Sequence, residues 1–162
     1  MKRIVLFGPP LAGKVSILLA VADQFGAIVT SFEVENPDID LSNRALSTKW
    51  QAEGESHEVV TMSGAVWHPR AWDSLLKDES ILLVLDGQST RLEANLEFCL
   101  QLQLLGKVCK AIQVTKCDLA DTFDMERILK LGELFEVPVF LSRIDQSESL
   151  VQGVRYLARS SV

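Results

Sequence analysis

Residues 8–14 read Gly-Pro-Pro-Leu-Ala-Gly-Lys, a glycine-bounded loop that ends in a lysine. Two glycines let a loop turn its backbone N–H groups onto a phosphate, while the lysine supplies a cation and the following helix adds its positive dipole end. An apolar run precedes the loop and a helical spacing of apolar residues follows it. The pattern predicts phosphate binding, and the residues assigned to it are Gly8, Leu11, Ala12, Gly13 and Lys14. The alternative is a plain Gly/Pro turn between a strand and a helix.

Val15 follows the lysine, where a loop of this kind needs a hydroxyl to hold Mg²⁺. Mg²⁺ takes oxygen ligands in near-octahedral geometry, and an alkyl side chain offers none. We therefore expect Mg²⁺ binding to be weak or absent, and we assign no metal ligand. Ser16 carries a hydroxyl one position later, which a helix rotates by about 100°. We expect Val15 and Ser16 to border the nucleotide site, with the Ser16 hydroxyl directed at a phosphate oxygen.

Residues 115–118, Thr-Lys-Cys-Asp, come directly after a predicted strand about a hundred residues beyond the loop. At that position the Asp118 carboxylate can accept hydrogen bonds from the N1–H and 2-amino groups of guanine. Adenine presents an acceptor at N1, and leaving a buried carboxylate unpaired can reject ATP by ~10³-fold. The stem of Lys116 would cover the base, and its ammonium could reach back to the loop. We assign Thr115, Lys116 and Asp118 to base binding; the alternative is a solvated turn.

Alternating strand and helix patterns indicate how these residues are positioned. The predicted strands span 2–7, 27–34, 57–62, 80–85, 108–114 and 137–141. Predicted helices follow the first loop, span 93–105 and 125–135, and begin at about residue 147. Because no clear helix separates the strands 27–34 and 57–62, we expect that pair to be antiparallel at one edge. The segment 35–56 has little periodicity and is predicted to be a long, functional surface loop.

These elements predict an α/β fold of the three-layer P-loop NTPase type. We expect a six-stranded, mostly parallel sheet with one antiparallel edge strand and about five helices, in a single domain over 1–162. The ligand of such a sheet lies beyond the carboxyl ends of its strands. The loop 8–14 and the segments 61–64, 115–118 and 142–143 all fall there.

The composition narrows the class of protein. The chain has 162 residues, 48% of them hydrophobic and 23% charged, which is typical of one globular domain. The net charge of −6 and the absence of a basic cluster argue against nucleic acid as a partner. Neither a signal peptide nor a long apolar stretch is evident, so we expect a cytoplasmic protein without direct membrane insertion. Its three cysteines have no metal-ligand spacing, which fits a reducing compartment.

The order of these motifs over essentially the whole chain resembles the Ras superfamily of small GTPases. In finer detail it is similar to the bacterial mutual gliding protein (MglA) type. The residues that carry the finer resemblance are the loop 8–14, Thr61-Met62-Ser63-Gly64 with Thr in place of the usual Asp, and the stretch Asp86–Asn95. The resemblance implies that Val15 replaces a Mg²⁺-binding hydroxyl and that Ala65 replaces a Gln that orients water. It also implies switch roles for Thr61, Gly64 and Ala65.

The resemblance implies further site residues. The first switch would lie in the segment 35–56, where Ser47 or Thr48 offers a hydroxyl. Ser142 would place a backbone N–H near the guanine oxygen, and Arg143 would stack on or cover the base. Arg44 as an internal arginine finger and His68 as a base or water-positioning group are candidate catalytic residues, with solvated loop positions as the alternative.

A protein partner is expected at the switch face. The tryptophans at 50, 67 and 72 lie near the two switch segments in sequence, and aromatic side chains are enriched at binding hot spots. We expect a regulatory or effector protein to bind there. For Trp72 we favour a place in the core under the second switch.

These observations favour a guanine-nucleotide-binding regulatory protein of the cell-polarity type. GTP or GDP would be its ligand, and intrinsic GTP hydrolysis would be slow or absent because Val15 and Ala65 remove polar groups from the γ-phosphate end. Two alternatives stay open. One is a competent GTPase that a partner completes, and the other is an interaction scaffold that binds no nucleotide.

Overall fold

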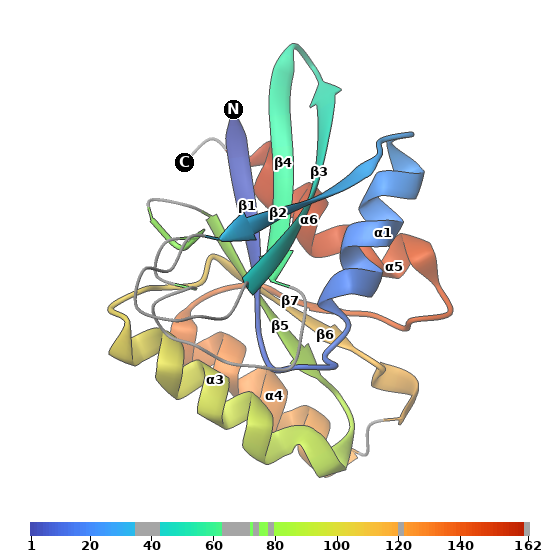
Figure 1. Cartoon of the computed structure of the whole chain (residues 1–162). Helices are drawn as coiled ribbons and strands as arrows, with labels where there is room; N and C mark the ends of the chain where they lie inside the picture. Colours follow the sequence, from blue (N-terminus) through green and yellow to red (C-terminus); the bar gives the residue numbers. More distant parts are fainter. Residues whose placement is uncertain (35–42, 63–71, 73–74, 78–79, 120–121, 161–162) are drawn as a thin grey trace.

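In the computed structural model, residues 1–34, 43–62, 72, 75–77, 80–119 and 122–160 are described, and they form one seven-stranded sheet with helices on both faces (Figure 1). The strands are β1 (Lys2–Phe7), β2 (Val29–Val34), β3 (Asn43–Ala52), β4 (Glu55–Met62), β5 (Ser80–Asp86), β6 (Ala111–Thr115) and β7 (Val139–Leu141). The helices are α1 (Lys14–Gln24), α3 (Leu92–Leu104), α4 (Thr122–Phe135), α5 (Ser147–Leu150) and α6 (Gln152–Arg159), with 3₁₀ turns η1 (Ser89–Arg91) and η2 (Cys117–Leu119). The strand order is β2-β3-β4-β1-β5-β6-β7.

The period-two alternation of the strands divides the core between the two faces of the sheet. In β1, Val5 and Phe7 belong to the core cluster under α3 and α4, whereas Ile4 and Leu6 belong to the cluster under α1 and α6. All of these side chains are fully buried. The central strands are therefore apolar on both sides, as expected for parallel strands covered by helices. The predicted fold class is confirmed.

The segment 35–56 differs from its prediction as a surface loop, because residues 43–52 form strand β3. β3 pairs antiparallel with both β2 and β4, so these two strands do not pair with each other and the sheet has seven strands instead of six. The composition of β3 is largely polar, which hid the strand from a search for apolar runs. A two-residue turn joins β3 to β4, and Glu53 and Gly54 both have positive φ (53° and 81°), as the tight hairpin turn requires.

Four parallel strands bring the predicted site segments to one edge of the sheet. β1 pairs with β4 and β5, β5 with β6, and β6 with β7, all parallel. The carboxyl ends of β1, β5, β6 and β7 lead into the loop 8–14, Asp86, the segment 115–118 and Ser142. Gly8 packs against the backbone of β5, since a Cβ at this position would collide with the carbonyl oxygen of Val84.

Within the described ranges, no helix combines the length and the apolarity needed to cross a membrane.

Candidate functional site

The loop 8–14 delivers an uncapped helix N-terminus to the edge of the sheet. α1 begins at Lys14, and no side chain of the described residues caps it. The first intrahelical bond runs from Ile17 N–H to Gly13 O at 3.0 Å, so the N–H groups of residues 14–16 have no partner within the helix. Gly13 has φ +96°, and a Cβ there would lie 3.2 Å from Thr115 Cγ2. Only glycine suits this position, and the exposed N–H groups suit an anion.

The Lys14 side chain lies inside the loop that it terminates. Its ammonium donates to the carbonyl oxygens of Gly8 at 2.6 Å and Pro9 at 2.8 Å, and the residue is only 7% exposed. Burial removes water from the Lys14 ammonium and lowers its pKa from 10.5 to about 8. Among the described residues, no carboxylate forms an ion pair with it. A phosphate at the helix N-terminus would offer this ammonium a charged acceptor in place of two neutral ones.

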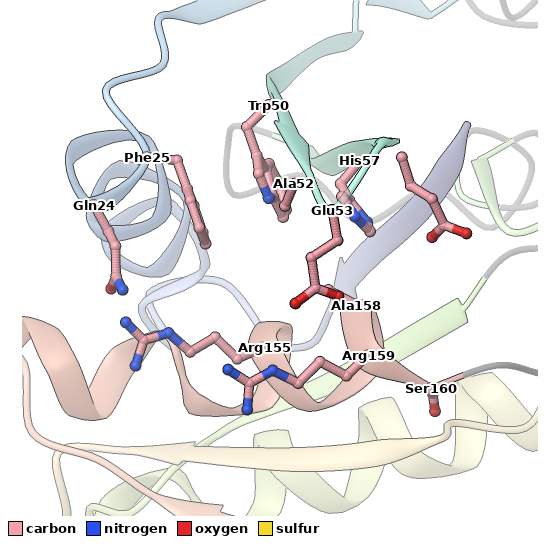
Figure 2. Close-up of a pocket in the computed structure, with 11 residues that line it drawn as sticks. Gln24, Phe25, Trp50, Ala52, Glu53, His57, Arg155, Ala158, Arg159 and Ser160 are labelled. Atoms are coloured by element: carbon pink, nitrogen blue, oxygen red, sulfur yellow. The ribbon is translucent and has the colours of Figure 1, made fainter.

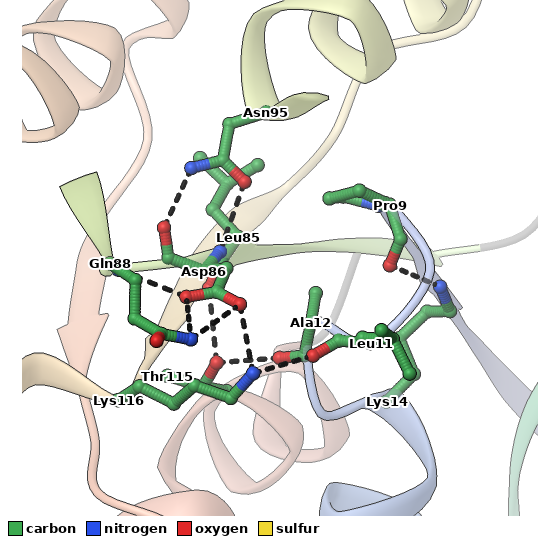
Figure 3. Close-up of polar contacts among 10 residues, drawn as sticks. All are labelled: Pro9, Leu11, Ala12, Lys14, Leu85, Asp86, Gln88, Asn95, Thr115 and Lys116. Atoms are coloured by element: carbon green, nitrogen blue, oxygen red, sulfur yellow. Dashed lines mark hydrogen bonds and ion pairs between the residues drawn. The ribbon is translucent and has the colours of Figure 1, made fainter. Parts of the chain in front are cut away.

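Lys116 connects the base-side segment to the loop. Its ammonium donates to the Leu11 carbonyl at 2.7 Å and forms an ion pair with Asp86 Oδ2 at 2.9 Å (Figure 3). Asp86 is 1% exposed, and its other oxygen, Oδ1, accepts the Gln88 N–H at 2.9 Å. The predicted reach of Lys116 to the loop is confirmed. The sequence reasoning missed Asp86 as its partner, although a carboxylate directly after the apolar run 81–85 was a usable signal.

Two further polar side chains hold the ends of β5 and β6 (Figure 3). Asn95 donates to the Asp86 carbonyl at 2.7 Å and accepts the Asp86 N–H at 3.0 Å. The Thr115 hydroxyl donates to the Ala12 carbonyl at 2.5 Å and is fully buried. Thr115 therefore fastens the loop to the sheet instead of pointing at a ligand.

The base end of the site is only partly arranged as predicted. Asp118 lies in η2 with its side chain exposed at the edge of the sheet. Ser142 is buried, and its N–H and its hydroxyl both donate to the Val114 carbonyl, at 2.8 and 2.7 Å. Its N–H is therefore already used, and the predicted contact with the guanine oxygen is not available in this conformation.

Arg143 does not cover the position of a base in this structure. Its guanidinium forms a two-point contact with Asp145, at 3.1 and 3.0 Å. The hydrogen bond and charge of Asp145 raise the pKa of Arg143, and the charge of Asp118 adds to the rise. The Arg143 guanidinium thus lies within the electrostatic reach of Asp118 while it pairs with Asp145.

A pocket of about 420 Å³ lies next to the start of α1. It is lined by Pro10, Leu11, Gly13, Lys14, Val15, Ser16, Met62, Lys116 and Ile144. Ser16 is the one residue of this lining with a side-chain oxygen. The Thr61 hydroxyl donates to the Leu6 carbonyl at 3.1 Å, inside the core. The described part of the site therefore does not fit the oxygen-rich shell that Mg²⁺ requires.

Several predicted residues lie away from this pocket or outside the described part of the chain. Thr48 is not in a switch loop, because it lies in β3 with its hydroxyl bonded to the Ile28 carbonyl at 3.0 Å. Arg44 is also in β3, opposite Glu33 of β2, and its side chain is outside the described part. The residues Gly64, Ala65, Trp67 and His68 lie outside it as well.

The two described tryptophans have different positions. Trp72 is 4% exposed and packs edge-on against Phe7, with ring centroids 4.9 Å apart, so its predicted place in the core is confirmed. Trp50 does not lie at a switch face. It stacks between Phe25 and His57, with centroid distances of 4.8 and 5.2 Å.

Comparison with known proteins gives a fold but no family. No family model and no curated protein matches the sequence. Among solved structures, the chain is similar to the cytosolic domain of the T. maritima FeoB iron transporter in its GMPPNP form, with a TM-score of 0.63 and 17% identity over 100% of this chain and 66% of that chain. It is also similar to the cytosolic domain of L. pneumophila FeoB, with a TM-score of 0.63 and 16% identity over 96% of this chain and 70% of that one. The chain thus has the P-loop GTPase fold and spans about two thirds of these structures.

The expected likeness to the MglA type was wrong, because the structures to which the chain is similar are FeoB cytosolic domains. The residues that suggested it have structural roles. Thr61 satisfies the carbonyl of Leu6 on the neighbouring strand, and Asn95 satisfies both backbone groups of Asp86. Such roles depend on how strands meet and do not identify one branch of a fold.

The Lys116–Asp86 pair yields a stability prediction. Replacing Lys116 by Met leaves the buried Asp86 carboxylate without its cation, which costs about 3–5 kcal/mol of unfolding free energy. The matched control is Arg143→Met, which removes a cation from the exposed pair with Asp145, where both side chains are at least 43% exposed. That control should change the unfolding free energy little, because water screens an exposed ion pair. Urea unfolding of the two variants measures the difference, and equal losses would contradict the assigned role of Lys116.

The buried Lys14 yields a pH-dependent prediction. The free-energy cost of burying the charged lysine is complete below about pH 8, where the lysine is protonated in both the folded and the unfolded chain. This cost is absent above the unfolded-state pKa of 10.5, where both states are neutral. Lys14→Met should therefore stabilise the nucleotide-free fold at pH 7 by ~1–2 kcal/mol, the burial penalty less the two lost hydrogen bonds. The gain should shrink between pH 8 and 10.5, where the wild-type lysine loses its proton.

Unfolding curves at pH 7 and pH 10 provide the measurement, with Lys130→Met on the exposed face of α4 as the control. The control variant should show no comparable gain at either pH. Destabilisation of Lys14→Met at pH 7 would mean that the two carbonyl bonds outweigh the cost of burial.

Proposed function

We propose that this chain binds a guanine nucleotide at the carboxyl edge of its sheet. The observation that carries the proposal is the bond from Lys116 to the Leu11 carbonyl, which holds the segment 115–118 against the loop 8–14. A phosphate-binding loop alone does not specify a base. A loop fixed beside an aspartate that can read the guanine edge supports recognition of both parts of one ligand.

The residues present fit the phosphate part of such a ligand. The free N–H groups at the start of α1 and the Lys14 ammonium can meet a diphosphate. Asp118 is exposed and free to accept the two donors of a guanine edge. The proposal is supported by the T. maritima FeoB cytosolic domain, which has a similar fold and whose structure is of the GMPPNP form.

Slow or absent hydrolysis is part of the proposal. Phosphoryl transfer is accelerated by positioning and by neutralising charge, and Val15 offers neither at the γ-phosphate end. The described lining contributes one hydroxyl, Ser16, and no carboxylate that could hold a metal. The expected protein partner would bind at the switch face, whose residues 63–71 lie outside the described part of the chain. The proposal is therefore confined to nucleotide binding.

Nucleotide titration tests the proposal. GDP should bind, and ATP should not compete with it. The affinity for GDP should change less than about tenfold when EDTA removes divalent metal. Asp118→Asn should weaken GDP binding by ~10²-fold or more, because an amide presents a donor to the guanine 2-amino group. The same variant should gain affinity for xanthosine diphosphate, whose ring has a carbonyl in place of that amino group. Tight binding of ATP by the wild-type chain would overturn the assignment of Asp118.

A second measurement concerns hydrolysis. Single-turnover GTP cleavage should be close to the uncatalysed rate in the wild-type chain. The double variant Val15→Thr, Ala65→Gln should raise the rate and its Mg²⁺ dependence together, because it restores an oxygen ligand and a group that orients water. Val15→Ile serves as the control, since it changes the size of the side chain but adds no oxygen. Rapid Mg²⁺-dependent cleavage by the wild-type chain would contradict the proposal.

The position of Lys14 favours a second candidate, a scaffold that binds no nucleotide. Its ammonium is already satisfied by two carbonyls within the loop. A melting experiment separates the two functions, since GDP at 100 times its dissociation constant stabilises the fold by ~2.7 kcal/mol. An unchanged melting temperature at every GDP concentration would favour the scaffold.

A further inference from the structure

A second pocket, of about 610 Å³, lies at the opposite end of the sheet from the loop 8–14. Its walls come from the β3–β4 hairpin, the end of α1 and the end of α6 (Figure 2). β4 connects the two pockets, because His57 near its start lines this one and Met62 at its end lines the other. The size lies within the ~300–1,000 Å³ of small-molecule sites.

One wall of this pocket is a stack of three rings with an unpaired nitrogen. Phe25, Trp50 and His57 lie one on another, with interplanar angles of 8° and 20°. His57 is 4% exposed, and its Nδ1 is buried without a hydrogen-bond partner. An unpaired buried polar atom costs about 1–3 kcal/mol. Because Nδ1 itself is closed off from the pocket, a ligand could pair with it only after the ring turns.

The facing wall carries two guanidinium groups. Arg155 and Arg159 are one turn apart on α6, and Figure 2 shows both opposite Trp50 and His57. Within the described part of the chain, neither forms an ion pair or a hydrogen bond through its side chain. Two adjacent guanidinium groups bind phosphate well because each offers a planar set of donors.

The tip of the hairpin adds the opposite charge. Glu53 and Glu55 line the same pocket, and Figure 2 shows the Glu53 carboxylate extending into the space above α6. Neither carboxylate lies within ion-pair distance of the two arginines. A ligand that fits these walls therefore has an anionic group at one end and hydrogen-bond donors at the other. Because Phe25 and His57 cover the two faces of Trp50, the Trp50 ring can offer a ligand only its edge. This edge and the Phe25 ring favour an aromatic or apolar body between the ends.

We propose that this pocket is a small-molecule site for a nucleoside monophosphate. The phosphate would bind Arg155 and Arg159, the amino or N–H groups of the base would bind Glu53, and the base would lie against the aromatic wall beside His57. The inference does not depend on nucleotide binding at the loop 8–14. Recognition of the base need not match that at Asp118, since the carboxylates here, Glu53 and Glu55, lie at a hairpin turn instead of following a parallel strand.

Binding is tested in the Lys14→Met, Asp118→Asn background, so that the loop site does not contribute. AMP, GMP, CMP and UMP are titrated by calorimetry at concentrations up to ~1 mM, which detects binding free energies of about −4 kcal/mol and stronger. The four parent nucleosides and ribose 5-phosphate are the fragment controls. At least one monophosphate should bind at least tenfold more tightly than its nucleoside and than ribose 5-phosphate. Failure of all the monophosphates to bind overturns the proposal.

Arginine variants and the NMR signal of His57 test whether the monophosphate binds in this pocket. The double variant Arg155→Gln, Arg159→Gln should lower the affinity at least tenfold. The control Lys130→Gln, which also removes a positive charge but lies on α4, should leave the affinity unchanged. The chain has two histidines, so ¹⁵N imidazole spectra compared with those of His57→Phe assign the His57 signal. The monophosphate should shift this signal and leave that of His68 in place. Binding that survives the double arginine change, or that leaves His57 unperturbed, overturns the assignment.

Discussion

The arrangement of the candidate site depends on one buried ion pair, between Lys116 and Asp86. The carboxylate ends an apolar strand and has almost no contact with water, so it requires a cation. Lys116 supplies that cation from the end of the neighbouring strand and uses a second donor on the Leu11 carbonyl. Three segments that are far apart in the sequence are therefore fixed relative to one another. Breaking the pair would leave the buried Asp86 carboxylate without its cation and would remove one of the two side-chain links between β6 and the loop, the other being the bond from the Thr115 hydroxyl to the Ala12 carbonyl.

Lys14 and Lys116 both place an ammonium group at the loop 8–14, but only Lys116 is paired with a carboxylate among the described residues. Lys116 is balanced by a carboxylate, so its charge is part of the fold. Within the described part of the chain, the partners of Lys14 are two backbone carbonyls, and burial lowers its pKa to about 8. The loop thus contains one positive charge that no described carboxylate neutralises. An anion at the start of α1 is the partner that would restore this balance, which is why the geometry favours phosphate over an uncharged ligand.

The sequence predicted the elements that are apolar or are marked by glycine, and missed those that are polar. The bounds of β1 were predicted as observed, and the position of α1 followed from the loop that precedes it. β3 was missed because most of its residues are polar and its stability comes from pairing on both sides. The reach of Lys116 followed from spacing along parallel strands. The roles of Thr61, Asn95 and Ser142 did not, because each depends on a carbonyl or N–H brought near by the tertiary fold.

The two proposed sites share strand β4, yet the structure favours independent binding. β4 is held to β1 over a register that runs from Lys2 opposite His57 to Val5 opposite Val60. The Thr61 hydroxyl adds a bond to the Leu6 carbonyl just before β4 reaches the loop pocket. A displacement of His57 could reach Met62 only by sliding β4 along β1, which would break this ladder and turn the buried faces of both strands out of register. A ligand at the hairpin pocket is thus more readily accommodated by side-chain movement at the hairpin end, and occupancy of one site should leave the affinity of the other unchanged.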